Sequence, residues 1–128
     1  MKTANSTLKT WLVALLPPIL WAGLIFLFSA QSVLASLEVS ALDFVFKKVA
    51  HMFVYGVLYL LLHRALLMLF PNRAWWFYLF IPLLVCLAYA LTDEYHQSLV
   101  PGRHPSSRDI GYDMLGVVIA ILARYGYI

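Results

Sequence analysis

Residues 44–70 read FVFKKVAHMFVYGVLYLLLHRALLMLF, and this stretch decides the fold. It is a nearly unbroken apolar run, longer than the roughly 20 residues that a helix needs to cross a bilayer. Three further apolar segments flank it. The sequence therefore predicts an all-α polytopic membrane protein, a bundle of four transmembrane helices with spans at about residues 10–28, 44–70, 74–92 and 110–125.

The composition excludes the soluble classes of protein. Of the 128 residues, 63% are hydrophobic and 12% are charged, whereas a soluble domain carries about 25% charged residues. A soluble chain of this size cannot bury so much apolar surface, which excludes a soluble enzyme, a disordered chain and a nucleic-acid-binding module. The single cysteine, Cys86, excludes an internal disulfide and a cysteine-based zinc site.

The chain reads as one domain over residues 1–128. Residues 71–73, Pro-Asn-Arg, predict a tight turn that makes the second and third spans an antiparallel hairpin. Neighbouring groups can satisfy the carbonyls that a proline frees, so prolines inside the spans are expected to kink the helices without breaking them. The first span could instead be a signal peptide with cleavage near residues 33–35, but its apolar core is longer than such peptides usually have.

The basic residues predict the orientation of the bundle. Four spans place both termini and the turn at residues 71–73 on one side, which carries no acidic residue. Its basic residues are Lys2, Lys9, Arg64, Arg73 and Arg124. The opposite side carries all six acidic residues together with Lys47, Lys48, Arg103 and Arg108. Because basic residues favour the cytoplasmic side, we expect a multi-pass protein of the bacterial inner membrane with both termini in the cytoplasm.

Polar residues gather at the opposite, extracytoplasmic ends of the helices. Lys47, His51 and Tyr55 are spaced i, i+4 and i+8, so they form one stripe that enters the membrane. If the third helix continues beyond its apolar part, Asp93 and Gln97 share one face of it. Ionisable groups inside a membrane are costly and are functional candidates by default.

Several of these residues also have a purely structural interpretation. Ser106 and Asp109 have the spacing of a capping box at the start of the last helix. Gly116 and Ala120 form a small-xxx-small pattern, which favours close helix packing. Long or amphipathic side chains near span ends are expected to extend toward the nearest interface; these are Lys48, His63 and Arg64.

Four blocks of sequence together resemble the VanZ-like family of small bacterial membrane proteins. They are Phe28–Ser32, the Lys47, His51, Tyr55 and Leu58 stripe, residues 93–103 with Asp-Glu-x-His-Gln and Pro-Gly-Arg, and Ser107, Asp109, Asp113 and Gly116. The resemblance implies the motif positions His51, Glu94, Gln97, Arg103 and Asp109. It also implies a link to resistance against teicoplanin, a lipidated glycopeptide that acts on lipid-linked cell-wall precursors. Asp113 stands where the family commonly has asparagine.

Two functional hypotheses follow for the polar cluster. In the first, it binds an anionic lipid headgroup or a lipid-linked cell-envelope molecule, with Arg103 offering a bidentate fork to phosphate or carboxylate. The ligand-binding residues would be Lys47, Tyr55, Asp93, Gln97, Arg103, Asp109 and Asp113. In the second, the cluster is a hydrolase or transferase site for a lipid substrate, with Glu94 as general base and His51 as general acid.

Two further interpretations of the cluster stay open. A metal site lacks any recognisable ligand spacing, and nearby lysines and arginines would compete with the cation, so no metal or cofactor is predicted. The cluster could also be a salt-bridge network that only holds the helix ends together. The predicted partner is a membrane lipid or lipid-linked precursor and no nucleic acid, and the small residues of the last helix leave room for a homo-oligomer.

Overall fold

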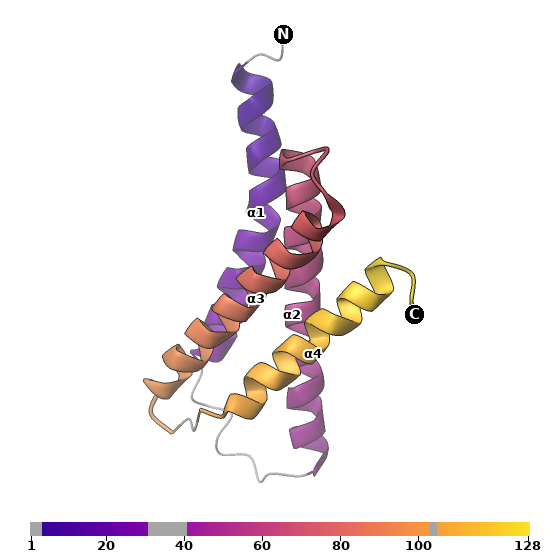
Figure 1. Cartoon of the computed structure of the whole chain (residues 1–128). Coiled ribbons are helices and arrows are strands. Elements are labelled where there is room, and N and C mark those ends of the chain that lie inside the picture. Colours follow the sequence, from indigo (N-terminus) through magenta and orange to yellow (C-terminus); the bar gives the residue numbers. More distant parts are fainter. Residues whose placement is uncertain (1–3, 31–40, 103–104) are drawn as a thin grey trace.

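The computed structural model describes residues 4–30, 41–102 and 105–128. In this part of the chain the secondary structure is entirely helical. Figure 1 shows the four helices, which run alternately down and up: α1 (Ala4–Ser29), α2 (Ala41–Leu69), α3 (Trp75–Ser98) and α4 (Ser107–Arg124). The prolines of α1 and α3 lie inside unbroken helices, as the sequence predicts.

Within the described residues, three helices are long and apolar enough to cross a membrane. These segments are Thr7–Ser29, Val45–Leu69 and Trp75–Ser98. The prediction of four spans is therefore confirmed only in its coarser form, as an all-helical chain with several membrane-spanning helices. Helix α4 exists where a fourth span was predicted, but four of its 18 residues are charged, which lowers its hydropathy below that of the other three.

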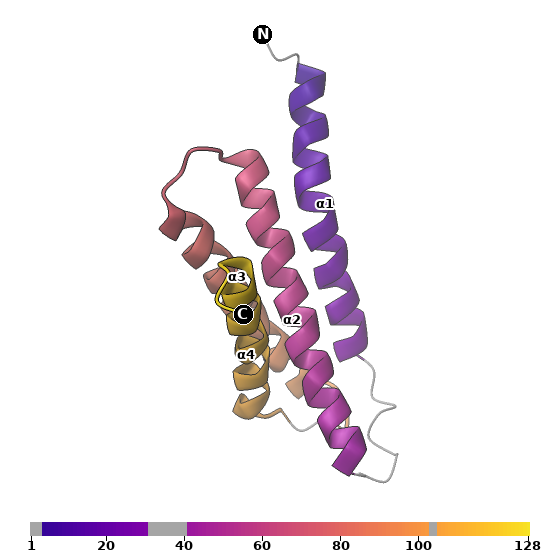
Figure 2. The ribbon, with the colours of Figure 1, turned by 90° about the vertical axis from the view of Figure 1, so that its right-hand side faces the viewer.

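Helix α2 is the centre of the bundle. It packs against the other three helices, with α1 on one side and α3 and α4 on the other (Figure 2). Its most extensive contact is with α4, and two glycines allow it. Gly116 lies so close to α2 that an added Cβ atom would overlap the Met52 carbonyl, and a Cβ on Gly56 would lie 3.1 Å from the Gly116 oxygen. The predicted packing role of Gly116 and Ala120 is confirmed, since both are buried at this contact.

Side-chain hydrogen bonds to backbone carbonyls tie α1 to the rest of the bundle. Trp21 Nε1 donates to the Val54 carbonyl on α2 at 2.8 Å. The Tyr89 hydroxyl on α3 donates to the Ala22 carbonyl on α1 at 2.5 Å. These bonds give each donor a partner within an apolar interior, where an unpaired donor would be costly. A hydrophobic cluster that includes Cys86 fills the space between the helices.

The α2–α3 turn is held by one tyrosine. Tyr78 Oη accepts from the Arg73 backbone N–H at 2.9 Å and donates to the Phe70 carbonyl at 2.7 Å. Asn72 supplies the left-handed conformation of the turn, with φ of 68°. His63 does not extend to the interface as expected; it is buried, with its ring next to those of nearby tyrosines.

Candidate functional site

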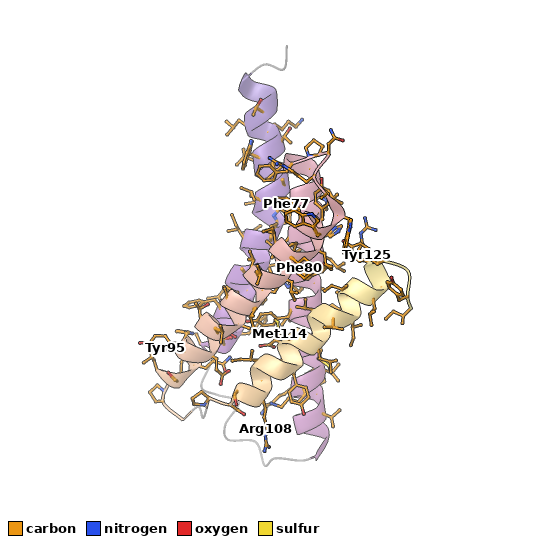
Figure 3. The ribbon with its side chains drawn as sticks, viewed as in Figure 1. Phe77, Phe80, Tyr95, Arg108, Met114 and Tyr125 are labelled. Carbon is orange, nitrogen blue, oxygen red and sulfur yellow. The ribbon has the colours of Figure 1, made fainter. Side chains whose placement is uncertain are left out.

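All four helices contribute to one polar end of the bundle. Helices α1 and α3 end there and helices α2 and α4 begin there, as the alternating directions in Figure 1 require. Figure 3 places Tyr95 and Arg108 at this end and Tyr125 at the far end of α4. This polar end consists of Ser29, residues 47–55, residues 93–102 and residues 105–113.

A cavity of about 450 Å³ lies in the polar end. This volume is within the range typical of small-molecule sites, about 300–1,000 Å³. Its walls combine apolar side chains, such as Ile25 and Val54, with lysine and carboxylate groups. Six predicted site residues line it: Lys47, His51, Tyr55, Asp93, Gln97 and Asp109.

Two side-chain pairs join α2 to α4 beside this cavity, although Asp113 is not among its described lining residues. Lys48 Nζ forms an ion pair with Asp109 Oδ1, and both side chains are largely buried. One turn deeper, His51 Nδ1 is hydrogen-bonded to Asp113 Oδ1 at 2.9 Å. Lys48 was expected to extend to the interface, but its pairing with Asp109 holds it against α4. Because unpaired charges in a poorly solvated site are costly, each pair stabilises the α2–α4 contact.

A second polar group joins α3 to α1. Gln97 Nε2 donates to Asp93 Oδ2 at 3.1 Å and lies 3.4 Å from Ser29 Oγ. All three side chains are buried. Asp93 and Gln97 therefore share one face of α3, as their i, i+4 spacing predicts. Ser29 belongs to the block Phe28–Ser32 but is not one of the site residues that the sequence predicts. Its position in the last turn of α1 is the signal that could have identified it.

Glu94 serves the start of α4 and is absent from the described cavity lining. Its Oε1 accepts from the Ser106 backbone N–H, while Ser106 Oγ accepts from the Arg108 N–H at 3.3 Å. Ser106 is thus the N-cap, as predicted. The capping-box interpretation of Asp109 is wrong, because Asp109 binds Lys48 and Glu94 from α3 takes the reciprocal position.

The loop before α4 contributes its backbone to the cavity. Gly102 lines the cavity with φ of 81°, a left-handed conformation that glycine adopts without strain. Arg103, the predicted phosphate fork, and His104 lie outside the described residues. Among the residues described, no group of three or more metal-ligand side chains is placed to hold a metal ion.

The helices and their polar end define a class, that of a multi-pass membrane protein with a cavity lined by apolar and charged side chains from several helix ends. A family model described as VanZ/LLP1 matches residues 12–125, nearly the whole chain. The chain belongs to the VanZ/LLP1 family. No curated protein and no solved structure matches it.

Proposed function

We propose that the polar end is an extracytoplasmic site that binds an anionic lipid headgroup or a lipid-linked cell-envelope molecule. In this proposal residues 1–128 form one VanZ-like domain of the bacterial inner membrane. Helix α4 is its fourth span, and both termini are cytoplasmic. The link to teicoplanin resistance implied by the family resemblance belongs to the same proposal, because the drug acts on lipid-linked precursors outside the cell.

The cavity is the observation that carries the proposal. Side chains from α1, α2, α3 and α4 line it together, although the residues that carry them are far apart in the sequence. Lys47 and Lys48 line it beside apolar side chains of α1 and α2. A site of this kind suits a molecule with an anionic head and an apolar tail, because cations bind phosphate while the tail stays in lipid.

Native mass spectrometry of the protein purified with its lipids tests this function. We expect a retained phospholipid or lipid-linked precursor, and its loss in the Lys47→Ala variant. Lys9→Ala is the matched control, because Lys9 is exposed near the opposite end of α1 and its replacement should leave the bound lipid unchanged. Equal lipid retention by the protein and by both variants would contradict the proposal.

A membrane-embedded hydrolase or transferase is the second candidate, and the His51–Asp113 hydrogen bond favours it. A carboxylate that orients an imidazole is the arrangement of many general bases. The carboxylate in contact with His51 is Asp113, however, while Glu94 binds the Ser106 N–H. An enzyme that uses His51 and Glu94 as its acid–base pair should lose lipid turnover in Glu94→Gln while it still binds lipid. Turnover that persists in Glu94→Gln would exclude this pair.

A further inference from the structure

Within the described residues, two polar atoms from the cavity lining lack a hydrogen-bond partner. Asp93 is 5% exposed and Tyr55 is 0% exposed, and both line the cavity. Asp93 Oδ2 accepts from Gln97, but Asp93 Oδ1 and the Tyr55 hydroxyl have no hydrogen-bond partner among the described residues. Buried polar atoms are nearly always hydrogen-bonded in native proteins, so this pair is expected to receive a donor from a bound molecule.

The lysines and the Asp93 carboxylate lie at different depths along the helices that line the cavity. Lys47 and Tyr55 are eight residues apart on α2, which places their Cα atoms about 12 Å apart along the helix axis. Lys47 lines the cavity from the second turn of α2. On the antiparallel helix α3, the ring of Tyr89 lies beside that of Tyr55, with centroids 6.2 Å apart. Asp93 lies one turn nearer the helix end than Tyr89, which still places Asp93 about one turn farther inside than Lys47. An occupant of this cavity therefore meets a lysine near the helix ends and a carboxylate farther inside.

From this arrangement we infer that the site takes a zwitterionic phosphoethanolamine headgroup, with its phosphate near Lys47 and its ammonium group at Asp93 and Tyr55. The inference rests on the proposed lipid-binding function and narrows its ligand class. A primary ammonium carries three N–H donors. It can bond both Asp93 Oδ1 and the Tyr55 hydroxyl, and it neutralises a carboxylate that is otherwise buried with one oxygen unpaired.

The choline headgroup provides a direct comparison. Its trimethylammonium carries the same charge and has no N–H to donate. We expect the purified full chain to bind an ethanolamine phospholipid about ten-fold more tightly than a choline phospholipid with the same acyl chains. A ten-fold ratio is about 1.4 kcal/mol, the size of one net hydrogen bond. Phosphatidic acid, which offers a phosphate without an amine, serves as the third probe in the same native mass spectrometry titration.

Two variants locate the ammonium group. Asp93→Asn and Tyr55→Phe should each reduce the ethanolamine preference, Asp93→Asn to less than about two-fold, while binding of phosphatidic acid is retained. Tyr59→Phe is the matched control. Its hydroxyl is also buried and unpartnered in the described part of the chain, one helical turn from Tyr55, but it does not line the cavity. This control should keep the full preference. If Asp93→Asn fails to fold, as its unfolding midpoint would reveal, Tyr55→Phe decides the test.

The outcomes separate this inference from the proposed function. Equal binding of ethanolamine and choline lipids, with all three lipids weakened by Lys47→Ala, would overturn the ammonium subsite and leave a phosphate site. An ethanolamine preference that survives both Asp93→Asn and Tyr55→Phe would also overturn it. Failure of all three lipids to bind would overturn the proposed function itself.

Discussion

The approach of α4 to α2 at Gly116 yields the sharpest prediction about how the site is held together. A Cβ atom at this position would overlap the Met52 carbonyl, a backbone atom that cannot move without shifting α2. Overpacking of a close contact costs about 1–3 kcal/mol. Gly111→Ala is the matched control on the same helix, because a Cβ there meets nothing within 4 Å. It should instead gain about 0.5–1 kcal/mol from the higher helix propensity of alanine.

The free energies of unfolding of the two variants should therefore differ by about 1.5–4 kcal/mol, Gly116→Ala being less stable and Gly111→Ala more stable than the unchanged protein. Gly56→Ala should fall between them, because its Cβ would lie 3.1 Å from the Gly116 oxygen and needs only a small shift. The assay is reversible unfolding in mixed detergent micelles, followed by tryptophan fluorescence. Equal unfolding free energies for Gly116→Ala and Gly111→Ala would refute the close α2–α4 contact, and with it the geometry of the cavity.

Three further predictions concern the charged pairs and the orientation. A double-mutant cycle of Lys48→Ala and Asp109→Ala should give a coupling energy of about 1–2 kcal/mol in the same assay, and additive effects would contradict the ion pair. Asp113→Ala, which removes the partner of His51 in the hydrogen bond between them, should cost about 3–5 kcal/mol. Asp113→Asn should cost less because its amide oxygen still accepts a hydrogen bond; equal costs for the two variants would show that the pair depends on charge alone. A fluorescent protein fused to the C-terminus should be bright and a fused alkaline phosphatase inactive, while an active phosphatase would place that end outside the cytoplasm.

The sequence predicts well what depends on one helix at a time. Length and hydropathy are local properties, so the helices appear close to the predicted spans. The i, i+4 spacing likewise puts Lys47, His51 and Tyr55 on one stripe of α2, and all three line the cavity. The extent of α3 was underestimated, because its last turns are polar and hydropathy alone ended the span at residue 92 while the helix continues to Ser98.

Contacts between helices could not be predicted in the same way. Which carboxylate meets which basic side chain depends on the rotation and spacing of two helices, and the close approach of α2 to α4 at Gly56 and Gly116 is not visible in either helix alone. Spacing within one helix favoured a capping role for Asp109, yet Asp109 binds Lys48 and Glu94 from α3 reaches the cap. The position of His63 near the end of a span predicts that it extends to the interface. The tyrosine rings that surround it come from three different helices or helix ends, so its position in the sequence does not reveal them.

The long sequence separation of the charged pairs also bears on how the protein is made. Asp109, the partner of Lys48, lies 61 residues farther along the chain, and Asp113, the partner of His51, lies 62 residues farther along. Both carboxylates belong to α4. During co-translational insertion α2 therefore reaches the membrane before either carboxylate has been synthesised. A chain that lacks α4 therefore lacks both of these carboxylates, and the α2–α4 contact forms only after the last helix has been made.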